Sequence, residues 1–278
     1  MSGRALVTGA AGFVGTTLCA YLEERAWEVV RGVLPGQTGG LPCDITNPKL
    51  LHECFEAAGP LTHIFHLAAI AFVPAANKNP ALAIDVNLSG TIHLSEIARE
   101  HTPGARFIYV GSSDAYGTPL SLPISEAHPL NPINIYAISK AAADHYCSYL
   151  HRAHGMDVVR MRPFNHSGPR QEPAFFLPSC AKQIAEIEAG LKPPVMQVGN
   201  LLASRDFSHV HDVVRAFEAA ALRGGAGEAY NVCMGRSYTM REALDAMLRR
   251  AKVEIATELD PARLRPSELP GIVGANNK

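Results

Sequence analysis

The sequence predicts an α/β protein with a doubly wound parallel sheet and a smaller, discontinuous second lobe. Three observations indicate this. Apolar runs alternate with helical patterns over roughly the first 165 residues, a glycine-rich loop follows the first run, and loop-forming residues become common after Phe164. The apolar runs are continuous rather than alternating, which is typical of strands that helices cover on both faces of a parallel sheet.

The expected strands are short apolar runs, and the expected helices carry apolar residues at helical spacing. In chain order they are RALVTG, Phe13 to Arg25, EVVRGV, HIFHLAA, Leu88 to Arg99, RFIYVGSS, Tyr136 to His151 and DVVRMRPF.

The part after Phe164 reads as inserted material followed by a return to the main sheet. The loop NHSGPRQEPAFFLP precedes an expected helix from about Ser179 to Gly190 and a short strand in PPVMQVGN. HVHDVVRAFEAAALRG and EAYNVCMG then resemble a helix and a strand of the main sheet. We therefore expect a dinucleotide-binding lobe from residues 1–164 and 205–235, and a second lobe from residues 165–204 and 236–278.

Composition excludes several classes of function. Twenty-five basic residues against 26 acidic ones give no global field that would attract nucleic acid or an anionic membrane. The longest stretch without a charge, residues 57–77, is interrupted by glycine and proline, and no signal-like core begins the chain. Six scattered cysteines favour free thiols in a reducing cytoplasm, and the histidines at 63, 66, 209 and 211 do not suggest a metal site.

Gly9, Gly12 and Gly15 in VTGAAGFVG lie between an apolar strand and a helix, the context in which such a loop indicates dinucleotide binding. A tight turn without a ligand is the alternative. The second strand ends in VVRGVLPG and lacks the acid typical of NAD sites, so Arg31 is a candidate for the 2'-phosphate of NADP, with NAD as the alternative. Asp44, which opens DITN, is either an adenine contact or an ordinary turn aspartate.

The stretch NIYAISK places Tyr136 and Lys140 four residues apart, hence on one face of a helix. A lysine ammonium would stabilise a phenolate, so we expect it to lower the pKa of Tyr136 and make the phenol an acid–base group. Taken alone, this spacing is commonly just a solvated helix face. The dinucleotide loop and the hydroxyls of YVGSSDAYG favour the catalytic interpretation.

At this point the sequence resembles the extended short-chain dehydrogenase/reductases, the family of NAD-dependent epimerases and dehydratases with a Rossmann fold. The motifs that carry the resemblance are TGAAGFVG, HLAA, GSSDAYG, YAISK and RPFNHSGPRQ. It implies that Ser112 hydrogen-bonds the reacting sugar oxygen, that Tyr136 is the acid–base group, and that Lys140 also holds the nicotinamide ribose. Asn87 is similar to a family asparagine beside the active-site helix. Further expected cofactor contacts are Phe13, Val14, Ile45, Leu67, Ala68 and Ala69. His166, beside Asn165, either borders the nicotinamide or is an ordinary loop histidine.

Within that family, FNHSGPRQ, VGNLLASRDFSHVHD and LRPSELP resemble the GDP-mannose branch. The resemblance implies that Asn165, Arg205 and Arg265 hold a diphosphate, a task that suits amides and forked guanidinium groups. Glu268 would accept hydrogen bonds from the nucleotide ribose, Lys182 would approach the base, and Ser113 would join Ser112 at the sugar.

The residue at position 114 bears on the type of reaction. The dehydratases that this chain resembles use a glutamate there to remove a sugar proton, and Asp114 is one methylene shorter. The leading hypothesis is therefore NADPH-dependent reduction of the C4 ketone of a GDP-4-keto-6-deoxyhexose to a rhamnose- or talose-type sugar. A 4,6-dehydratase in which Asp114 is the base, a 4-epimerase, and a non-catalytic dinucleotide-binding subunit are the alternatives. The family resemblance also implies a homodimer.

Overall fold

The computed structural model describes residues 3–264 and 269–278. Its centre is a seven-stranded sheet with strand order β10-β6-β5-β4-β1-β2-β3, in which each neighbouring pair is parallel. The strands are β1 (Arg4–Thr8), β2 (Glu28–Val33), β3 (Leu41–Pro42), β4 (His63–His66), β5 (Arg106–Val110), β6 (Val158–Pro163) and β10 (Ala229–Val232). The predicted doubly wound parallel sheet is confirmed.

Helices cover both faces of this sheet. They are α1 (Phe13–Glu23), α2 (Pro48–Ala58), α5 (Gly90–His101), α6 (Ile135–His154) and α8 (Val210–Arg223). The short helices α3 (Val73–Lys78) and α4 (Pro80–Ile84) pack against α6. Helix α5 is preceded by a π-helical turn, Asp85–Ser89, and β5 is followed by a 3-10 turn, Ser113–Tyr116.

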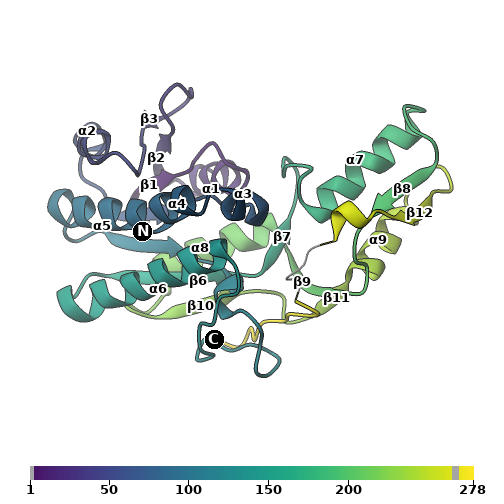
Figure 1. Ribbon diagram of the computed structural model, residues 1–278. Helices are drawn as coiled ribbons and strands as arrows, with labels where there is room; N and C mark the ends of the chain where they lie inside the picture. The colour runs from purple at the N-terminus through teal and green to yellow at the C-terminus, as the bar shows by residue number, and fades with distance from the viewer. Residues whose placement is uncertain (1–2, 265–268) are drawn as a thin grey trace.

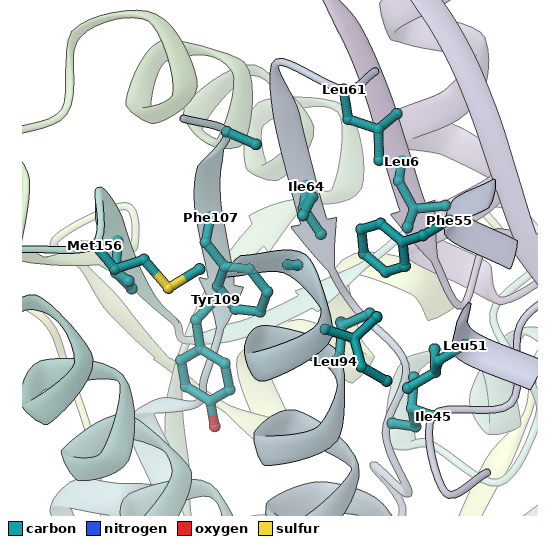
Figure 2. Packing of buried hydrophobic residues seen from close by; sticks show 14 of the residues in the cluster. Leu6, Ile45, Leu51, Phe55, Leu61, Ile64, Leu94, Phe107, Tyr109 and Met156 are labelled. Atoms are coloured by element: carbon teal, nitrogen blue, oxygen red, sulfur yellow. The ribbon is translucent and has the colours of Figure 1, made fainter. Parts of the chain in front are cut away.

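Two hydrophobic clusters fix the layers. On one face, α2, α5 and α6 pack on the sheet through residues such as Phe55, Leu94 and Leu150, and Figure 2 shows Phe55 and Leu94 close to Leu6 and Ile64 of the strands. On the other face, α1 and α8 contribute residues that include Leu18, Leu22 and Phe217. Burial of this apolar area is the main favourable contribution to folding. The helices packed on both faces thus fix the sheet, and the carboxyl ends of its parallel strands lie along one edge.

The smaller lobe has its own core. Helices α7 (Phe176–Glu188) and α9 (Met240–Leu248) pack against the parallel pair β8 (Val195–Val198) and β12 (Ala256–Leu259). A third sheet, of order β11-β9-β7, is built from β7 (Asn165–Ser167), β9 (Ser204–His209) and β11 (Ser237–Thr239). A short 3-10 turn, Pro261–Arg263, follows β12. Figure 1 shows α7, α9, β8 and β12 apart from the main sheet, with β7, β9 and β11 between the two parts.

The last residues of the chain return to the main sheet. Gly274 forms a bridge with Ile124, the side-chain amide of Asn231 donates to the carbonyl of Ala275, and Lys278 Nζ lies 2.6 Å from Glu228. The chain therefore crosses between the two parts several times. Within residues 3–264 and 269–278, no helix is long and apolar enough to cross a membrane.

Candidate active site

The loop between β1 and α1 is shaped by its glycines. Gly9 has a φ of +68°, and a Cβ atom there would lie 2.9 Å from the backbone nitrogen of Ala68. A Cβ atom on Gly15 would lie 2.1 Å from the carbonyl oxygen of Gly9. Gly12 occupies the N-cap of α1 and has no side chain to cover the first-turn amides. The loop therefore fits a pyrophosphate, which these amides and the helix dipole would hold.

We expect Gly15→Ala to weaken NADPH binding by about ten-fold or more, because the added methyl group forces the loop and α1 apart at a cost of about 1–3 kcal/mol. Fluorescence titration with NADPH measures the effect. Gly104→Ala is the matched control, because a Cβ atom there meets nothing within 4 Å. Equal affinity in the two variants would contradict a pyrophosphate site at this loop.

At the end of β2, the Arg31 guanidinium is held by Glu23 of α1, with Nη2 2.7 Å from both carboxylate oxygens. Asp44 accepts two hydrogen bonds from Thr46, from the amide at 2.9 Å and from the hydroxyl at 2.7 Å, as an aspartate in a local turn does. The side chain of Ile45 is buried in the core against Gly90. The cofactor roles of these three residues stay predictions, and Ile45 could serve only through its backbone.

Helix α6 carries the tyrosine and the lysine. It begins after Asn134, whose side chain accepts a hydrogen bond from the amide of Ala137 at 2.9 Å, and it ends at Gly155 in the left-handed conformation. Tyr136 and Lys140 lie in its first turns and are both buried, at 9% and 4% exposure. The helix thus presents the pair toward the carboxyl end of β5.

The expectation that Lys140 lowers the pKa of Tyr136 is wrong for this structure. Burial, and secondly the charge of Asp114, raise the pKa of the phenol above its ordinary value, while a side-chain hydrogen bond with Ser112 opposes the shift. A protonated phenol at neutral pH is suited to donate a proton rather than to accept one.

The ammonium of Lys140 instead bonds to the backbone. Nζ donates to the carbonyl oxygen of Val110 at 2.6 Å and lies 5.0 Å from the centre of the Tyr109 ring. Burial lowers the pKa of Lys140 to about 8, although the charge of Asp144 opposes this shift. The cation therefore lies at the end of β5, where that strand leads into the Ser112 turn.

Ser112, Ser113 and Asp114 come together in the 3-10 turn after β5. The Ser112 hydroxyl oxygen accepts a hydrogen bond from the amide of Asp114 at 3.2 Å, so the side chain caps the turn. Ser112 and Ser113 are both buried. The turn places the Ser112 hydroxyl and the Asp114 charge beside Tyr136, as the electrostatic effects on the phenol show.

The sequence analysis considered His66, the first residue of HLAA, only as a metal ligand and missed its structural role as a buried residue. The Thr91 hydroxyl donates to the carbonyl of Asn87 at 2.7 Å, so it must accept from His66 Nε2, 2.9 Å away. His66 Nδ1 is then the acceptor for the Thr8 hydroxyl at 2.9 Å. Burial, and secondly the charge of Lys140, lower the pKa of His66 to about 3. The ring is thus a neutral bridge of fixed tautomer between β1, β4 and α5.

This bridge supports the residues around the expected cofactor. Thr8 also accepts from the amide of Ala68, at 3.2 Å, and Asn87 bonds to Ile70 and to the hydroxyl of Ser139 on α6, at 2.9 Å. Ser139 in turn donates to the carbonyl of Tyr136 at 2.8 Å. Asn87 therefore ties the segment after β4 to the active-site helix, as its family likeness implies.

A cleft of about 750 Å³ separates the smaller lobe from the main sheet. Asn165, His166, Lys182 and Arg205 line it, so four of the predicted ligand residues are brought together. Ser112 and Tyr136 are not among the described residues that line the cleft. Val73 connects the two regions, because it lines the cleft and also packs against the cluster that contains Tyr136. Arg265 and Glu268 lie outside the described residues.

The cleft has a cationic part and an apolar part. Arg263, which the sequence analysis missed although it lies two residues before Arg265, joins Lys182 and Arg205 in the lining. Phe72, from the main part, and Phe175, from the smaller lobe, also line it and meet edge to face with ring centres 5.6 Å apart. No local sequence pattern predicts a contact between residues about a hundred positions apart.

The glycine loop and the cleft meet at His166. Its ring stacks on Phe13, the first residue of α1, with centres 6.1 Å apart, and its Nδ1 bonds to the carbonyl of Phe164 at 2.9 Å. A dinucleotide on the glycine loop would thus reach the cleft near His166 and Val73. The described residues contain no group of three or more His, Cys, Asp or Glu side chains that could hold a metal ion.

Comparisons with known proteins agree with this arrangement. The model of the NAD dependent epimerase/dehydratase family matches residues 5–233. A GDP-6-deoxy-D-mannose reductase of Pseudomonas aeruginosa is 36% identical over 99% of this chain and 89% of its own length. A UDP-glucose 4-epimerase of Mycolicibacterium smegmatis is 32% identical over 94% of this chain and 87% of its own length.

Among solved structures, RMD from Pseudomonas aeruginosa complexed with NADPH matches with a TM-score of 0.89 and 34% identity, covering 99% of this chain and 90% of that one. The fold, the site and the sequence similarity lead to the same conclusion: the chain belongs to the NAD-dependent epimerase/dehydratase family of extended short-chain dehydrogenase/reductases.

Proposed function

We propose that this protein reduces the C4 ketone of a GDP-4-keto-6-deoxyhexose to the corresponding GDP-6-deoxyhexose, with NADPH as reductant. The observation that carries the proposal is the 36% identity to a GDP-6-deoxy-D-mannose reductase over 99% of the chain, which a protonated, buried Tyr136 complements. NADP is favoured over NAD because the RMD structure that this chain resembles contains NADPH.

The residues divide the reaction among them. When bound, the dinucleotide supplies the hydride that adds to the C4 carbon. The Tyr136 phenol donates its proton to the carbonyl oxygen as negative charge develops there, and the Ser112 hydroxyl hydrogen-bonds the same oxygen and orients it. The Lys140 ammonium donates to the carbonyl of Val110, at the end of the strand that leads into the Ser112 turn. The product is an alcohol, and the phenol is restored by a proton from solvent.

The cleft supports the choice of a nucleotide-linked sugar. Arg205, Lys182 and Arg263 provide positive charge along its length, and Asn165 adds an amide. Such groups suit a diphosphate. The roles assigned to Arg265 and Glu268 remain part of this proposal on the strength of the family resemblance alone.

The test is the absorbance of NADPH when the purified protein meets GDP-4-keto-6-deoxy-mannose, with GDP-mannose as the control. We expect one NADPH to be oxidised for each keto sugar consumed, and none with GDP-mannose. Analysis of the product at C4 then assigns a rhamnose-type or a talose-type sugar. An absence of NADPH oxidation with the keto sugar would overturn the proposal.

Two specific observations favour tests for a dehydratase and an epimerase activity. A carboxylate, Asp114, lies beside Tyr136, at the position where the resemblance to the dehydratases implies a base, and a UDP-glucose 4-epimerase is 32% identical to this chain. Conversion of GDP-mannose to a keto sugar would identify a 4,6-dehydratase. Interconversion of UDP-glucose and UDP-galactose without net NADPH oxidation would identify a 4-epimerase. A non-catalytic dinucleotide-binding subunit would bind NADPH and do none of these.

The proposal extends to the setting of the enzyme. All six cysteines are free thiols, which suits the cytoplasm, where nucleotide sugars would be its substrates. A homodimer, which the family resemblance implies, would use the exposed face of α6 that carries Ile138 and Tyr149. Light scattering of the purified protein measures the oligomeric state directly.

A further inference from the structure

A buried ionic network extends from the active-site helix into the sheet. Asp144 lies one helical turn after Lys140 on α6 and is 1% exposed. Arg162, on β6, is 4% exposed and holds this carboxylate with two hydrogen bonds, from Nε at 2.9 Å and from Nη2 at 2.8 Å. Arg160, two residues earlier, donates a third at 2.7 Å. The carboxylate therefore fixes α6 to β6 in one geometry.

The other end of the same guanidinium bonds to the Ser112 turn. Arg162 Nη1 donates to the Tyr116 hydroxyl at 3.0 Å and to the carbonyl of Glu126 at 3.1 Å. Tyr116 is the last residue of the 3-10 turn that Ser112 caps. Its hydroxyl donates to Asn231 on β10 at 2.7 Å, and its ring is fully buried. One arginine thus joins the two elements that carry Ser112 and Tyr136.

The backbone before Ser112 lies directly against this network. A Cβ atom on Gly111 would lie 3.0 Å from the carbonyl oxygen of Met161 and 3.7 Å from the Asp144 carboxylate. A side chain at residue 111 would therefore press against β6, and glycine lets the turn lie close to that strand. The amide of Gly111 also donates to the carbonyl of Met161 at 2.7 Å, so the backbone that leads to Ser112 is tied to the strand that carries Arg162.

The energetics argue for a role beyond stability. Burial of a carboxylate and a guanidinium removes both from water, and the attraction between them often does no more than offset that loss. Apolar residues of similar volume would commonly serve stability as well. Unlike apolar residues, the ion pair joins its two elements through several directional hydrogen bonds.

We propose that Asp144, Arg162 and Tyr116 are positioning residues that set the distance between the Ser112 hydroxyl and the Tyr136 phenol. This inference rests on the proposed function, in which both groups act on one carbonyl oxygen. The network touches neither substrate nor cofactor and works through the two elements it joins. Misplacement of a reacting group by about an ångström costs on the order of a hundred-fold in rate.

Tyr116→Phe tests the proposal, because it removes the hydroxyl and keeps the buried ring. We expect kcat to fall by about ten-fold to a hundred-fold with the KM for NADPH unchanged. Tyr21→Phe is the matched control: it removes a hydroxyl that donates to the carboxylate of Glu218 at 3.0 Å, on the opposite face of the sheet. Calculated per folded molecule, the kcat of Tyr21→Phe is expected to equal that of the original protein.

A double-mutant cycle separates positioning from general damage. If Tyr116 acts through Ser112, the variant with both Tyr116→Phe and Ser112→Ala is no slower than Ser112→Ala alone. If the two losses multiply, or if Tyr116→Phe loses activity only in proportion to the unfolded fraction, the proposal is overturned.

A third measurement does not depend on turnover. We expect amide hydrogen exchange in residues 111–117 to become faster in Tyr116→Phe, while exchange in β1 and β4 keeps its original rate. Unchanged exchange in residues 111–117 would refute the proposal even if the keto sugar is not the substrate. If exchange in residues 111–117 becomes faster in Tyr116→Phe, but the protein without substitutions does not reduce the keto sugar, only the proposed function is refuted.

Discussion

Replacement of Tyr136 by phenylalanine is expected to lower kcat for the keto sugar by about 10³-fold while NADPH binds as before. Loss of a general acid costs about 10²–10⁴-fold, and here the phenol is the proton donor in the proposed step. Its burial and the neighbouring charge of Asp114 raise its pKa, so it is protonated across the neutral range and ready to donate. The variant keeps the ring, so the packing around Val73 and Ala76 is retained.

Steady-state assays and an NADPH fluorescence titration measure the two parts of this prediction. Tyr149→Phe is the control, because Tyr149 lies on the same helix but is 48% exposed. A Tyr136→Phe enzyme with more than a tenth of the original kcat would show that the proton comes from another group. Parallel loss of NADPH binding would instead indicate that the substitution disturbs the cofactor site.

Much of the fold could be predicted from the sequence because the signals are local. Continuous apolar runs specify strands that are covered on both faces. Gly9 and Gly15 have to be glycine because a neighbouring backbone atom occupies the space of a side chain. Tyr136 and Lys140 were found for the same reason, since four residues of helix place them on one face.

What the sequence did not reveal depends on contacts between distant residues. The Thr8–His66–Thr91 bridge, the Phe72–Phe175 contact and the pairing of β9 with β7 and β11 join segments with no local pattern in common. The pKa of Tyr136 was predicted in the wrong direction for a similar reason. Spacing along a helix reports which side chains share a face, but burial, which dominates the pKa, is set by the whole packed structure.

Lys140→Met should stabilise the protein at neutral pH although it impairs the enzyme. Burial lowers the pKa of Lys140 to about 8, against about 10.4 in an unfolded chain. At pH 7 the lysine is charged in both states, and the folded state bears a desolvation cost of about 3 kcal/mol at 1.36 kcal/mol per pKa unit. Met is similar in length and uncharged. Because the substitution also removes the bond to Val110, we expect a net gain of about 1–2 kcal/mol in the free energy of unfolding.

The sign of the pH dependence makes this prediction specific. Between pH 8 and about 10.4 the unfolded chain binds more protons at this residue than the folded one, so the contribution of Lys140 to stability rises with pH. The gain in the free energy of unfolding from Lys140→Met should therefore be largest near pH 7 and shrink toward pH 10.

Urea unfolding of both proteins across this range measures the gain. Lys182→Met, at an exposed lysine of the cleft, is the control. Two results would contradict the prediction: a Lys140→Met variant that is less stable than the original protein at pH 7, or a stability difference that does not change with pH. Either would mean that the charge of the buried lysine does not destabilise the folded state. The expected result would identify Lys140 as a site where the fold gives up stability to keep a cation beside the reacting groups.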